Sequence, residues 1–555
     1  MPVKVKLVNV EDGIISNGFR KMAAFVERLN EDTHTYFVST QDTRSISTKL
    51  LTRYDSTQLG TEEIDEIAEN LADADLVGFS SMTAYSDLTR AIITRLKEKS
   101  AKPYVVWGGI HPIVDPEDAI RSSADAVCTG EGELAFQEFY ELFKSGQDHR
   151  HVQNFWFRHD GETVRNCHRP LMTPQEMSDL PYPSYGEHER LYKKGKGFGP
   201  PALRDYLASN GLAYNTLWTI GCPYRCTYCG NSKFLANDPK YRKIRHPDPK
   251  YVIGEVKQAI ARHPHISSVI FNDDNLLFLN NEVLWEFSQS WHDEVGIPFC
   301  VLGVFPNAVD AKKLELLTWA GMNRVRMGIQ SGSKRILDFY RRPTSIEKVE
   351  QAARIISGFR KYHVAPGYDI IIDNPIETRQ DVVDTLELVY RLARPFSLNL
   401  YSLKVIPNTE LERQIREVSG GIDIDSIKVN FDRHDPTLAN VLLYVLQVIR
   451  PPRWLFDRLL ARALPRTVPQ PRYPVLYYVA RTLWGVKRGL SYLRLMDFST
   501  ILGSSGYWTW RLGIIDFWHR YLNAKPPEPA LEGDWPVGLK RPAPRSDREV
   551  LAEAS

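Results

Sequence analysis

Two hydrophobic patterns alternate along the first 148 residues of the chain. Short runs of apolar residues, typical of strands buried on both faces, are followed by longer segments whose apolar residues recur at helical spacing. This alternation predicts an α/β domain with a doubly wound parallel sheet. The predicted strands are Val5 to Val10, Tyr36 to Ser39, Leu76 to Ser81, Tyr104 to Gly109 and Ala126 to Gly130, and the predicted helices are Phe19 to Leu29, Thr61 to Leu71, Asp87 to Lys97 and Asp115 to Arg121.

A second stretch of alternating strands and helices runs from about residue 201 to residue 412. In repeated βα units that form a barrel, functional residues follow the carboxyl ends of the strands. The predicted strands are Asn215 to Thr219, Ser267 to Asn272, Phe299 to Val304, Arg324 to Gln330, Tyr368 to Ile372 and Leu398 to Val405, and the predicted helices include Pro249 to Ala261, Ala311 to Ala320, Ile346 to Tyr362 and Arg379 to Arg391.

Residues 149 to 200 have the pattern of a connector between these two regions. The segments Asn154 to Phe157 and Thr163-Val164 flank an Asp160-Gly161 pair, which predicts a β-hairpin with a tight turn. The run Leu180 to Pro183 breaks any regular element. The glycine-rich stretch from Lys193 to Pro201 indicates a flexible loop.

The region from residue 413 to residue 524 is rich in Trp, Tyr, Leu and Arg. Helical spacing of residues such as Leu459, Leu460 and Leu464 predicts a mainly helical region that packs on the preceding domain. An alternative is contact with a membrane surface through helices that have basic and aromatic faces. Several prolines and charges from residue 525 to residue 555 predict a disordered tail.

The composition is that of a soluble globular protein with several domains. Of the 555 residues, 43% are hydrophobic and 25% are charged. A net charge of +2 gives no indication of nucleic-acid binding. The first residues, MPVKVKLVNV, lack the apolar stretch of a signal peptide, and no apolar run is long enough to predict a membrane-spanning helix.

Three of the six cysteines stand close together in the run TIGCPYRCTYCGN, as Cys222, Cys226 and Cys229. Three thiolates on one loop can bind three irons of a [4Fe–4S] cluster and leave the fourth iron open to a substrate or cofactor. A structural zinc site is the alternative, but its fourth ligand would have to be His246, Cys300 or a more distant residue. Six cysteines in a chain of this length do not indicate a disulfide framework.

The C-x3-C-x2-C spacing, with Tyr228 before the last cysteine, resembles the signature of radical S-adenosylmethionine (SAM) enzymes. The resemblance implies that SAM binds the open iron of the cluster. It also implies that the six strand–helix units form a partial (β/α)6 barrel, with the cluster loop directly after the first strand. Tyr228 is then expected among the SAM-binding residues.

The same resemblance assigns further SAM-binding residues to other strand ends. In the family, the end of the second barrel strand contacts the SAM ammonium, and Asp273 or Asp274 would do so here because a carboxylate suits a cation. Capping of the following helix is the alternative role for these two residues. At the end of the fourth strand, Gln330 and Ser331 are expected near the SAM ribose or carboxylate, and Ser333 is a candidate helix cap.

Three loops of the first domain resemble those of the Rossmann-like cobalamin-binding domain that precedes many radical SAM barrels. They lie in the runs GFSSMT, VVWGGIHPIVDPEDAI and DAVCTGEGELAFQEF. A flavodoxin-like domain without a cofactor, or with another nucleotide, is the alternative. The expected cobalamin-binding residues are Ser80, Ser81, Met82, Thr83, Gly108, Gly109, Gly130, Glu131 and Gly132.

One feature of many cobalamin proteins, an Asp-x-His-x-x-Gly loop whose histidine binds cobalt, is missing from this sequence. The Asp32-Thr33-His34 run is not followed by the required glycine, and it precedes the second predicted strand. We therefore expect it to be a turn, and we expect no protein histidine on cobalt. Asp12-Gly13 occupies the corresponding loop.

These resemblances imply a cytoplasmic enzyme that uses a [4Fe–4S] cluster, SAM and cobalamin, and that receives electrons from a donor such as flavodoxin or ferredoxin. The expected reaction is methylation of an unactivated carbon in a small-molecule or lipid substrate. Cyclisation or rearrangement without methyl transfer is one alternative, and a cobalamin sensor or carrier is another. A methylthiotransferase is disfavoured because the first domain has only Cys128 and cannot hold a second cluster.

Overall fold

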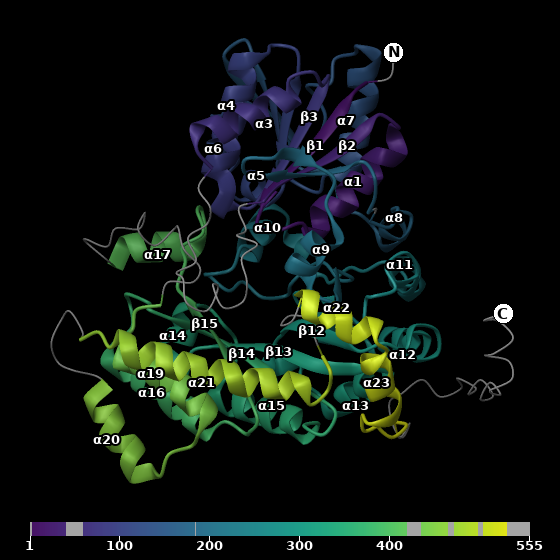
Figure 1. Ribbon diagram of the computed structural model, residues 1–555. Coiled ribbons are helices and arrows are strands. Elements are labelled where there is room, and N and C mark those ends of the chain that lie inside the picture. Colours follow the sequence, from purple (N-terminus) through teal and green to yellow (C-terminus); the bar gives the residue numbers. More distant parts are fainter. Residues whose placement is uncertain are drawn as a thin grey trace, which may run out of the picture.

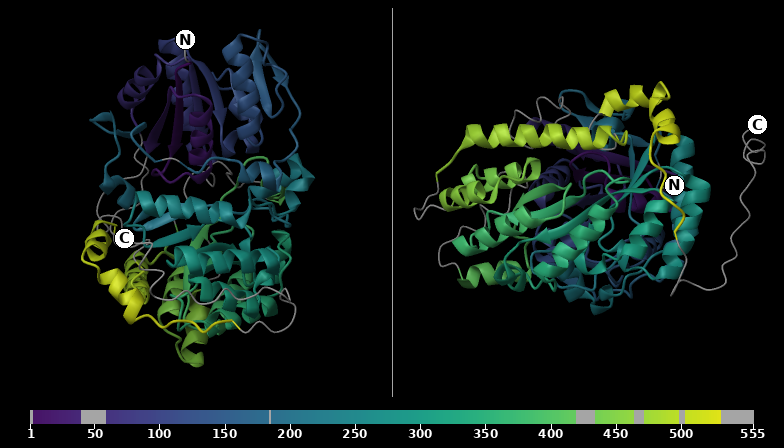
Figure 2. Two further views of the ribbon diagram at one scale, coloured as in Figure 1. Left: turned by 90° about the vertical axis from the view of Figure 1, so that its right-hand side faces the viewer. Right: turned by 90° about the horizontal axis from the view of Figure 1, so that it is seen from below.

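The computed structural model describes residues 3–39, 59–183, 185–418, 434–463, 471–497 and 503–529. The chain forms two α/β domains, one above the other, and a set of C-terminal helices that lie along the second domain (Figure 1). The two views in Figure 2 show the same stacking of the domains from the side and from below. The fold therefore agrees with the α/β architecture predicted from the sequence.

Among the described residues, the first sheet has nine strands in the order β7-β6-β5-β4-β3-β1-β2-β8-β9. The predicted parallel strands lie at its centre, with helices α1 and α7 packed on one face and α3, α4 and α6 on the other. Helices on both faces confirm the doubly wound arrangement. The elements are β1 (Val5–Glu11), α1 (Asn17–Leu29), β2 (Thr33–Ser39), α3 (Thr61–Leu71), β3 (Leu76–Ser81), α4 (Ser86–Lys99), β4 (Tyr104–Gly108), α5 (Ile110–Val114), α6 (Pro116–Ile120), β5 (Ala126–Cys128) and α7 (Glu133–Ser145).

The predicted connector differs from the structure because its strands extend the first sheet at both edges. The predicted hairpin is present as β6 (Phe155–His159) and β7 (Glu162–Arg165), which add to β5. Positive φ angles of 49° at Asp160 and 81° at Gly161 match its tight turn. At the other edge, β8 (Glu189–Lys193) pairs with β2 and then with β9 (Gly197–Gly199), where a flexible loop was expected.

The second domain is an open barrel of six parallel strands in the order β10 to β15, counted over the described residues. Its first and last strands are not paired in this part of the chain, so the barrel stays open on one side. The strands are β10 (Ala213–Thr216), β11 (Ser268–Phe271), β12 (Phe299–Val304), β13 (Met322–Gln330), β14 (Gly367–Ile372) and β15 (Ser397–Ser402), and the helices around them are α9 (Leu203–Asn210), α10 (Asn231–Asn237), α11 (Pro249–Arg262), α12 (Asn281–Ser290), α13 (Ala311–Ala320), α14 (Lys334–Phe339), α15 (Ile346–Gly358) and α16 (Arg379–Arg391).

The C-terminal region is mainly helical in its described parts, as predicted, and it packs on the barrel. Helix α19 contacts β15 and α16, α21 packs on α19, and α22 packs on α9 before the first barrel strand. These helices therefore contact both edges of the open barrel. The helices of the C-terminal region are α17 (Glu410–Val418), α19 (Leu438–Val448), α20 (Arg453–Ala463), α21 (Pro474–Leu493), α22 (Gly503–Arg511) and α23 (Ile514–Tyr521).

Two further predictions concern the C-terminal tail and membrane-spanning helices. Most of the predicted disordered tail, from residue 530 to residue 555, lies outside the described residues. In the part of the chain that the structure describes, no helix has both the length and the apolar character needed to cross a membrane.

The carboxyl ends of the two sheets face each other where the domains meet. Arg245, close to the first barrel strand, forms an ion pair of 2.6 Å with Glu131 of the first domain. Asn408 donates a hydrogen bond of 3.2 Å to the carbonyl oxygen of Val114, which ends α5. The φ of Asn408 is 59°, a left-handed conformation that asparagine adopts more readily than most residues.

Candidate active site

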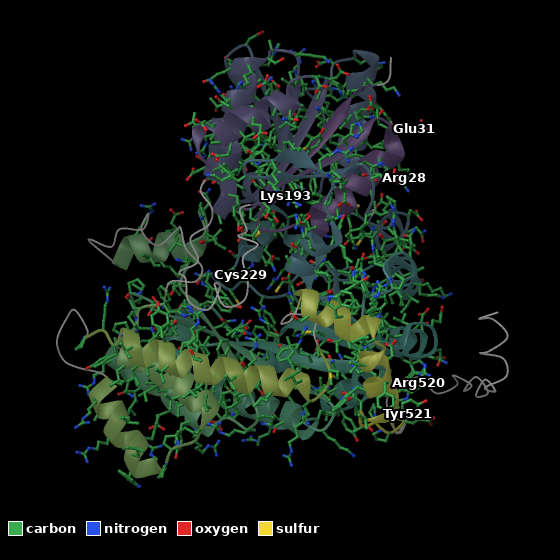
Figure 3. The ribbon with its side chains drawn as sticks, viewed as in Figure 1. Arg28, Glu31, Lys193, Cys229, Arg520 and Tyr521 are labelled. Atoms are coloured by element: carbon green, nitrogen blue, oxygen red, sulfur yellow. The ribbon has the colours of Figure 1, made fainter. Side chains whose placement is uncertain are left out.

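The cysteine loop follows β10 at the carboxyl end of the barrel, on the side that faces the first domain (Figure 3). Gly221 begins the loop with a φ of 117°, and a Cβ atom at this position would lie 2.6 Å from the carbonyl oxygen of Lys243. The Cys222 amide donates to the carbonyl oxygen of Tyr241 at 3.1 Å, and the Thr227 amide donates to that of Tyr340 at 3.0 Å. The loop is thus fixed at both ends before α10 begins.

The three thiols of this loop are close in sequence and differ in their burial. Cys226 is buried, Cys222 and Cys229 are half-buried, and none of the three forms a disulfide. Within the described residues, no three His, Cys, Asp or Glu side chains are arranged to hold one metal ion. A cubane binds each thiolate through a different iron, so its ligands stand further apart than those of one zinc ion.

Burial also changes the pKa values of two of these thiols. It raises the pKa of Cys222 to about 11 and that of Cys229 to about 12. Metal ligation requires thiolates, so the positive charge of the iron must favour their ionised form in the loaded protein. The Asn275 amide also donates a hydrogen bond of 3.1 Å to the sulfur of Cys222.

Arg342 is a site residue that the sequence did not reveal. It is almost fully buried, donates a hydrogen bond of 2.9 Å to the hydroxyl of Tyr228, and lies 3.9 Å from the sulfur of Cys226. Its guanidinium also stacks on the ring of Phe305 at 4.0 Å and bonds to the carbonyl oxygen of Gly328. Arg342 therefore positions Tyr228 and brings a fixed positive charge beside the cluster loop.

The structure separates the roles of the two adjacent aspartates after β11. Asp273 is buried, and its carboxylate accepts hydrogen bonds from the backbone amides of Trp218, at 3.2 Å, and Thr219. Asp274 is exposed and accepts a hydrogen bond of 2.7 Å from Asn231. Asn231 comes two residues after Cys229, and Asn275, which follows Asp274, donates to the sulfur of Cys222, so Asp274 lies beside the cysteine loop.

The alternative of helix capping is wrong for both aspartates. Asn275 occupies the N-cap position of the short helix from Leu276 to Phe278, without a side-chain cap bond, and Asn280 caps α12. Asp273 instead connects β11 to the segment that leads into the cysteine loop. The predicted contact of one of these aspartates with the SAM ammonium stays a prediction.

Gln330 and Ser331, at the end of β13, lie in different surroundings. Gln330 is half-buried and has a φ of 75°, a conformation that is uncommon outside glycine and often found at functional sites. Ser331 is fully buried, and its hydroxyl lies 3.2 Å from that of Thr385 and accepts the amide of Ser333. Ser333 caps α14, as suggested from the sequence. Ser331 thus stabilises the turn, and the predicted contact of Gln330 with SAM stays a prediction.

A polar network links the barrel strands β13, β14 and β15. Arg326 binds the carboxylate of Asp369 through its Nε at 2.8 Å, and it also bonds to the hydroxyl of Tyr401. Asn399 donates a hydrogen bond of 2.8 Å to the same carboxylate. A cavity of about 140 Å³ adjoins Arg326 and Asn399 and is also lined by Ala365 and Ser397, at the amino ends of the strands. Arg326 and Asn399 thus offer polar groups inside the barrel.

The carboxyl edge of the first sheet has features that fit cobalamin. Met82 and Ile110 are exposed at the ends of β3 and β4. Beside them, in the described part of the chain, the side chains of Asn9, Thr83 and His111 contain buried polar atoms without a hydrogen-bond partner. A corrin ring has a broad apolar face and amide side chains. Its face could cover Met82 and Ile110, and its amides could bond to the buried polar atoms.

Several predicted cobalamin-binding residues serve the fold of these loops. Ser81 is fully buried and accepts a hydrogen bond of 3.0 Å from the indole of Trp107. Gly109 has a φ of 89°, and a Cβ atom there would lie 2.8 Å from the hydroxyl oxygen of Ser80. Glu131 forms an ion pair with Arg245 across the domain junction. The side chains left to face a cofactor are those of Met82 and Thr83, together with the half-buried Ser80 and the backbones of Gly108, Gly130 and Gly132.

Comparison with known proteins agrees with this reading of both domains. A sequence model of the radical SAM superfamily matches residues 216–389, and a model of the B12 binding domain matches residues 46–140. The chain combines a radical SAM domain with a B12-binding domain. It therefore binds a [4Fe–4S] cluster and SAM in the barrel and cobalamin in the first domain.

Among curated relatives, the chain is 25% identical over 346 residues to "Uncharacterized methyltransferase PH0819" of Pyrococcus horikoshii, covering 59% of this chain and 69% of that protein. It is 22% identical over 304 residues to "Anaerobic magnesium-protoporphyrin IX monomethyl ester cyclase" of Synechocystis sp., covering 53% and 56%. The chain thus spans just over half the length of this cyclase.

Two solved structures share the fold of this B12-binding radical SAM protein. The radical S-adenosylmethionine methyltransferase TsrM from Kitasatospora setae has a TM-score of 0.59 at 16% identity, with 88% of this chain and 97% of that chain covered. The cobalamin-dependent S-adenosylmethionine radical enzyme OxsB has a TM-score of 0.57 at 15% identity, with 95% and 77% covered. At these identities the likeness concerns the fold alone.

The absence of a cobalt-binding histidine can be tested on the purified protein. His34 lies at the amino end of β2, at the edge of the sheet away from the barrel, with its Nε2 3.3 Å from Asp32. His111 lies at the cofactor edge but is buried, and its Nε2 is 3.1 Å from Asp118. We expect the paramagnetic resonance spectrum of bound cob(II)alamin to lack splitting from a protein nitrogen. Splitting that disappears in a His111→Ala variant would contradict this.

Proposed function

We propose that this chain methylates an unactivated carbon of a small-molecule or lipid substrate. The observation that carries the proposal is the junction between the domains, where the carboxyl edge of the B12-binding sheet faces the cysteine loop of the barrel. Arg245 with Glu131, and Asn408 with Val114, fix this arrangement. When bound, the cluster, SAM and cobalamin would supply a substrate radical and a methyl donor to one shared space.

The chain's own residues would orient the reactants in that space. Asp274 would hold the ammonium of SAM, and Gln330 would contact its ribose or carboxylate. The network of Arg326, Asp369 and Tyr401 would bind polar groups of the substrate from the inside of the barrel. We place the reaction in a reducing cytoplasm, with flavodoxin or ferredoxin as the electron donor.

Cyclisation without methyl transfer is a second candidate function. It is favoured by the similarity to three proteins named as anaerobic magnesium-protoporphyrin IX monomethyl ester cyclases, at 21–23% identity. The relative named as a methyltransferase favours methyl transfer instead. A sensor or carrier role is disfavoured, because the cysteine loop and its surroundings are those of a radical SAM barrel.

Products formed from an extract of the source cells can distinguish the two reactions. The reconstituted enzyme is incubated with this extract, a reductant and methyl-deuterated SAM, and the mixture is compared by mass spectrometry with a Cys226→Ala control. Methyl transfer predicts a compound that gains an intact labelled methyl group, with one 5′-deoxyadenosine and one S-adenosylhomocysteine released. A compound that is converted with release of 5′-deoxyadenosine but without label would favour cyclisation or rearrangement.

A further inference from the structure

Helix α21 exposes an apolar stripe along its length. Its apolar residues recur every three or four positions and therefore share one face of the helix. In a helix that is part of a globular core this face is buried, but here Val475 is 77% exposed and Leu490 is 61% exposed. The stripe consists of Val475, Val479, Leu483, Val486, Leu490 and Leu493.

The opposite face of α21 is already occupied by the barrel. The Trp484 indole donates to the Ser397 hydroxyl at 3.0 Å, and the Ser491 hydroxyl accepts the amide of Ala365 at 2.9 Å. Both partners lie at the amino ends of barrel strands, so these contacts fix the orientation of the helix. The apolar stripe is thus directed away from the protein by the packing of the other face.

The charges on α21 itself are all positive. The sequence from residue 471 to residue 496 has no Asp or Glu, whereas Arg481, Lys487, Arg488 and Arg494 lie on α21 or directly after it. An apolar face with Lys and Arg beside it is the pattern of a helix that lies in a membrane interface. Exposed aromatic side chains on the next two helices, Trp508 and Phe517, add to the apolar surface of this region.

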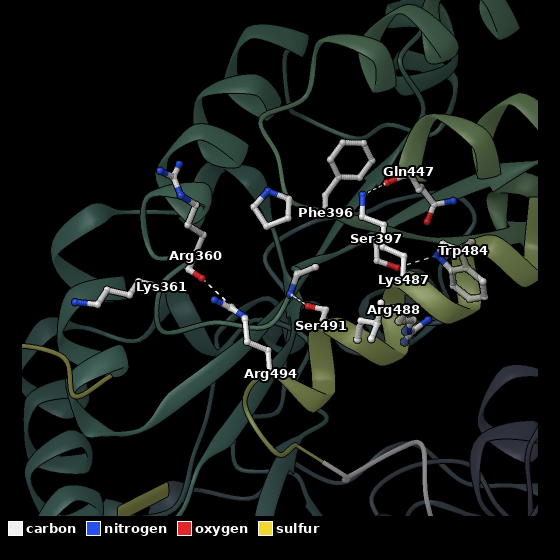
Figure 4. A pocket seen from close by; sticks show the side chains of 13 residues that line it. Arg360, Lys361, Phe396, Ser397, Gln447, Trp484, Lys487, Arg488, Ser491 and Arg494 are labelled. Atoms are coloured by element: carbon white, nitrogen blue, oxygen red, sulfur yellow. Dashed lines mark hydrogen bonds between the residues drawn. The ribbon is translucent and has the colours of Figure 1, made fainter. Parts of the chain in front are cut away.

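A basic cavity opens beside the stripe. It has a volume of about 460 Å³ and is formed by α21 and the segment that follows α15, and Leu490 of the stripe is one of its lining residues. None of the described residues that line it is acidic. Figure 4 shows its cationic residues, which come from both sides: Arg360, Lys361, Lys487, Arg488 and Arg494.

Two of these cationic groups are held at the cavity by hydrogen bonds to backbone carbonyl oxygens. Lys487 donates to the carbonyl oxygens of Gln447 and Val448, and Arg494 donates to that of Arg360, so both side chains are held in place. Arg360 and Lys361 are exposed. A phosphate group fits such a site because guanidinium groups bind its oxygens with directed hydrogen bonds.

We propose that α21 docks this protein on a membrane surface that contains anionic lipids. The apolar stripe would enter the interface between head groups and acyl chains, and lipid phosphates would bind in the basic cavity. A second copy of the chain fits this surface poorly, because a two-fold contact would bring the same positive charges together. The docked helix would lie beside the open side of the barrel, which α21 and α22 border.

Co-sedimentation with vesicles tests this proposal on the full chain. Binding is compared for vesicles of phosphatidylcholine alone and for vesicles that also contain phosphatidylglycerol. We expect binding to the anionic vesicles that weakens as the salt concentration rises, because exposed charges are screened. We expect the Leu483→Glu/Leu490→Glu variant to bind these vesicles at least about tenfold more weakly, since it places charges in the apolar stripe.

A second variant and a matched control complete the test. Each basic residue near an anionic surface contributes about fivefold to binding, so Arg360→Gln/Lys361→Gln should lose about twenty-fivefold. The control is Gln147→Glu/Gln175→Glu, which adds two negative charges to exposed sites of the first domain. It should bind like the wild type, and circular dichroism should show all variants folded.

Two results would overturn the proposal. One concerns vesicle binding: the wild-type chain sediments with neither kind of vesicle, or the stripe variant binds as well as the wild type. The other is a wild type that light scattering shows to be a dimer and a stripe variant that is a monomer, with no vesicle binding by either. The second result would assign the stripe to contact between two copies of the chain.

Discussion

Replacing Cys222, Cys226 or Cys229 with alanine should leave the chain unable to hold its iron–sulfur cluster. Each thiolate binds one iron, and two cysteines cannot retain a cubane whose fourth iron has no protein ligand. After anaerobic reconstitution, the wild type should contain about four irons per chain, whereas each variant should contain almost none. Iron and sulfide assays, together with the visible absorption of the cluster, measure this directly.

The other cysteines of the chain serve as controls for this experiment. Cys167 is exposed, and Cys128 and Cys300 are buried away from the loop, so the Cys167→Ala variant is the best matched. It should bind iron like the wild type. A stoichiometric zinc ion in anaerobically purified protein, with no uptake of iron, would show that the loop is a zinc site.

Replacing Asp274 with alanine should weaken SAM binding by about ten- to a hundredfold and leave the cluster intact. A charge-assisted hydrogen bond contributes roughly 1.5–3 kcal/mol, which corresponds to this range. The carboxylate accepts a hydrogen bond from Asn231, two residues after Cys229, and Asn275, which follows Asp274, donates to the sulfur of Cys222, so a SAM ammonium on the open iron would be close to it. Anaerobic titration of the reconstituted protein with SAM measures the change.

Replacing Asp273 with alanine should have a different effect and provides the comparison. The backbone amides of Trp218 and Thr219 would lose their buried acceptor, at a cost of about 1–3 kcal/mol for each unpaired group. We expect a lower melting temperature and less cluster, since these residues lead into the cysteine loop. The two roles would be reversed if the Asp274→Ala variant kept its SAM affinity and a stably folded Asp273→Ala variant lost it.

The regular elements of both α/β domains could be predicted because their hydrophobic patterns are strong and local. The predicted bounds of β3 (Leu76–Ser81) and α13 (Ala311–Ala320) are those of the structure. Strand β8 was not predicted, since it is short and its partner β2 is more than 150 residues away in the chain. Its position depends on a buried ion pair of 2.7 Å between Glu189 and Arg20, which no local pattern indicates.

The cluster ligands could be predicted from spacing, but their surroundings could not. Cys222, Cys226 and Cys229 share one short loop, so their sequence alone brings them together. Arg342 reaches the same loop only through folding, from a position more than 100 residues later in the chain. The choice between Asp273 and Asp274 also needed the structure, because neighbouring residues at a strand end point in opposite directions.

The central claim, that this B12-binding radical SAM protein transfers methyl groups, is tested most directly by the fate of the SAM methyl group when no substrate is present. The reconstituted chain is loaded with cobalamin, reduced, and given methyl-deuterated SAM, and the cobalamin is then extracted in the dark for mass spectrometry. Methyl transfer predicts cobalamin that carries the labelled methyl group, with S-adenosylhomocysteine released in equal amount. Unlabelled cobalamin, in a preparation that still cleaves SAM to 5′-deoxyadenosine, would contradict it.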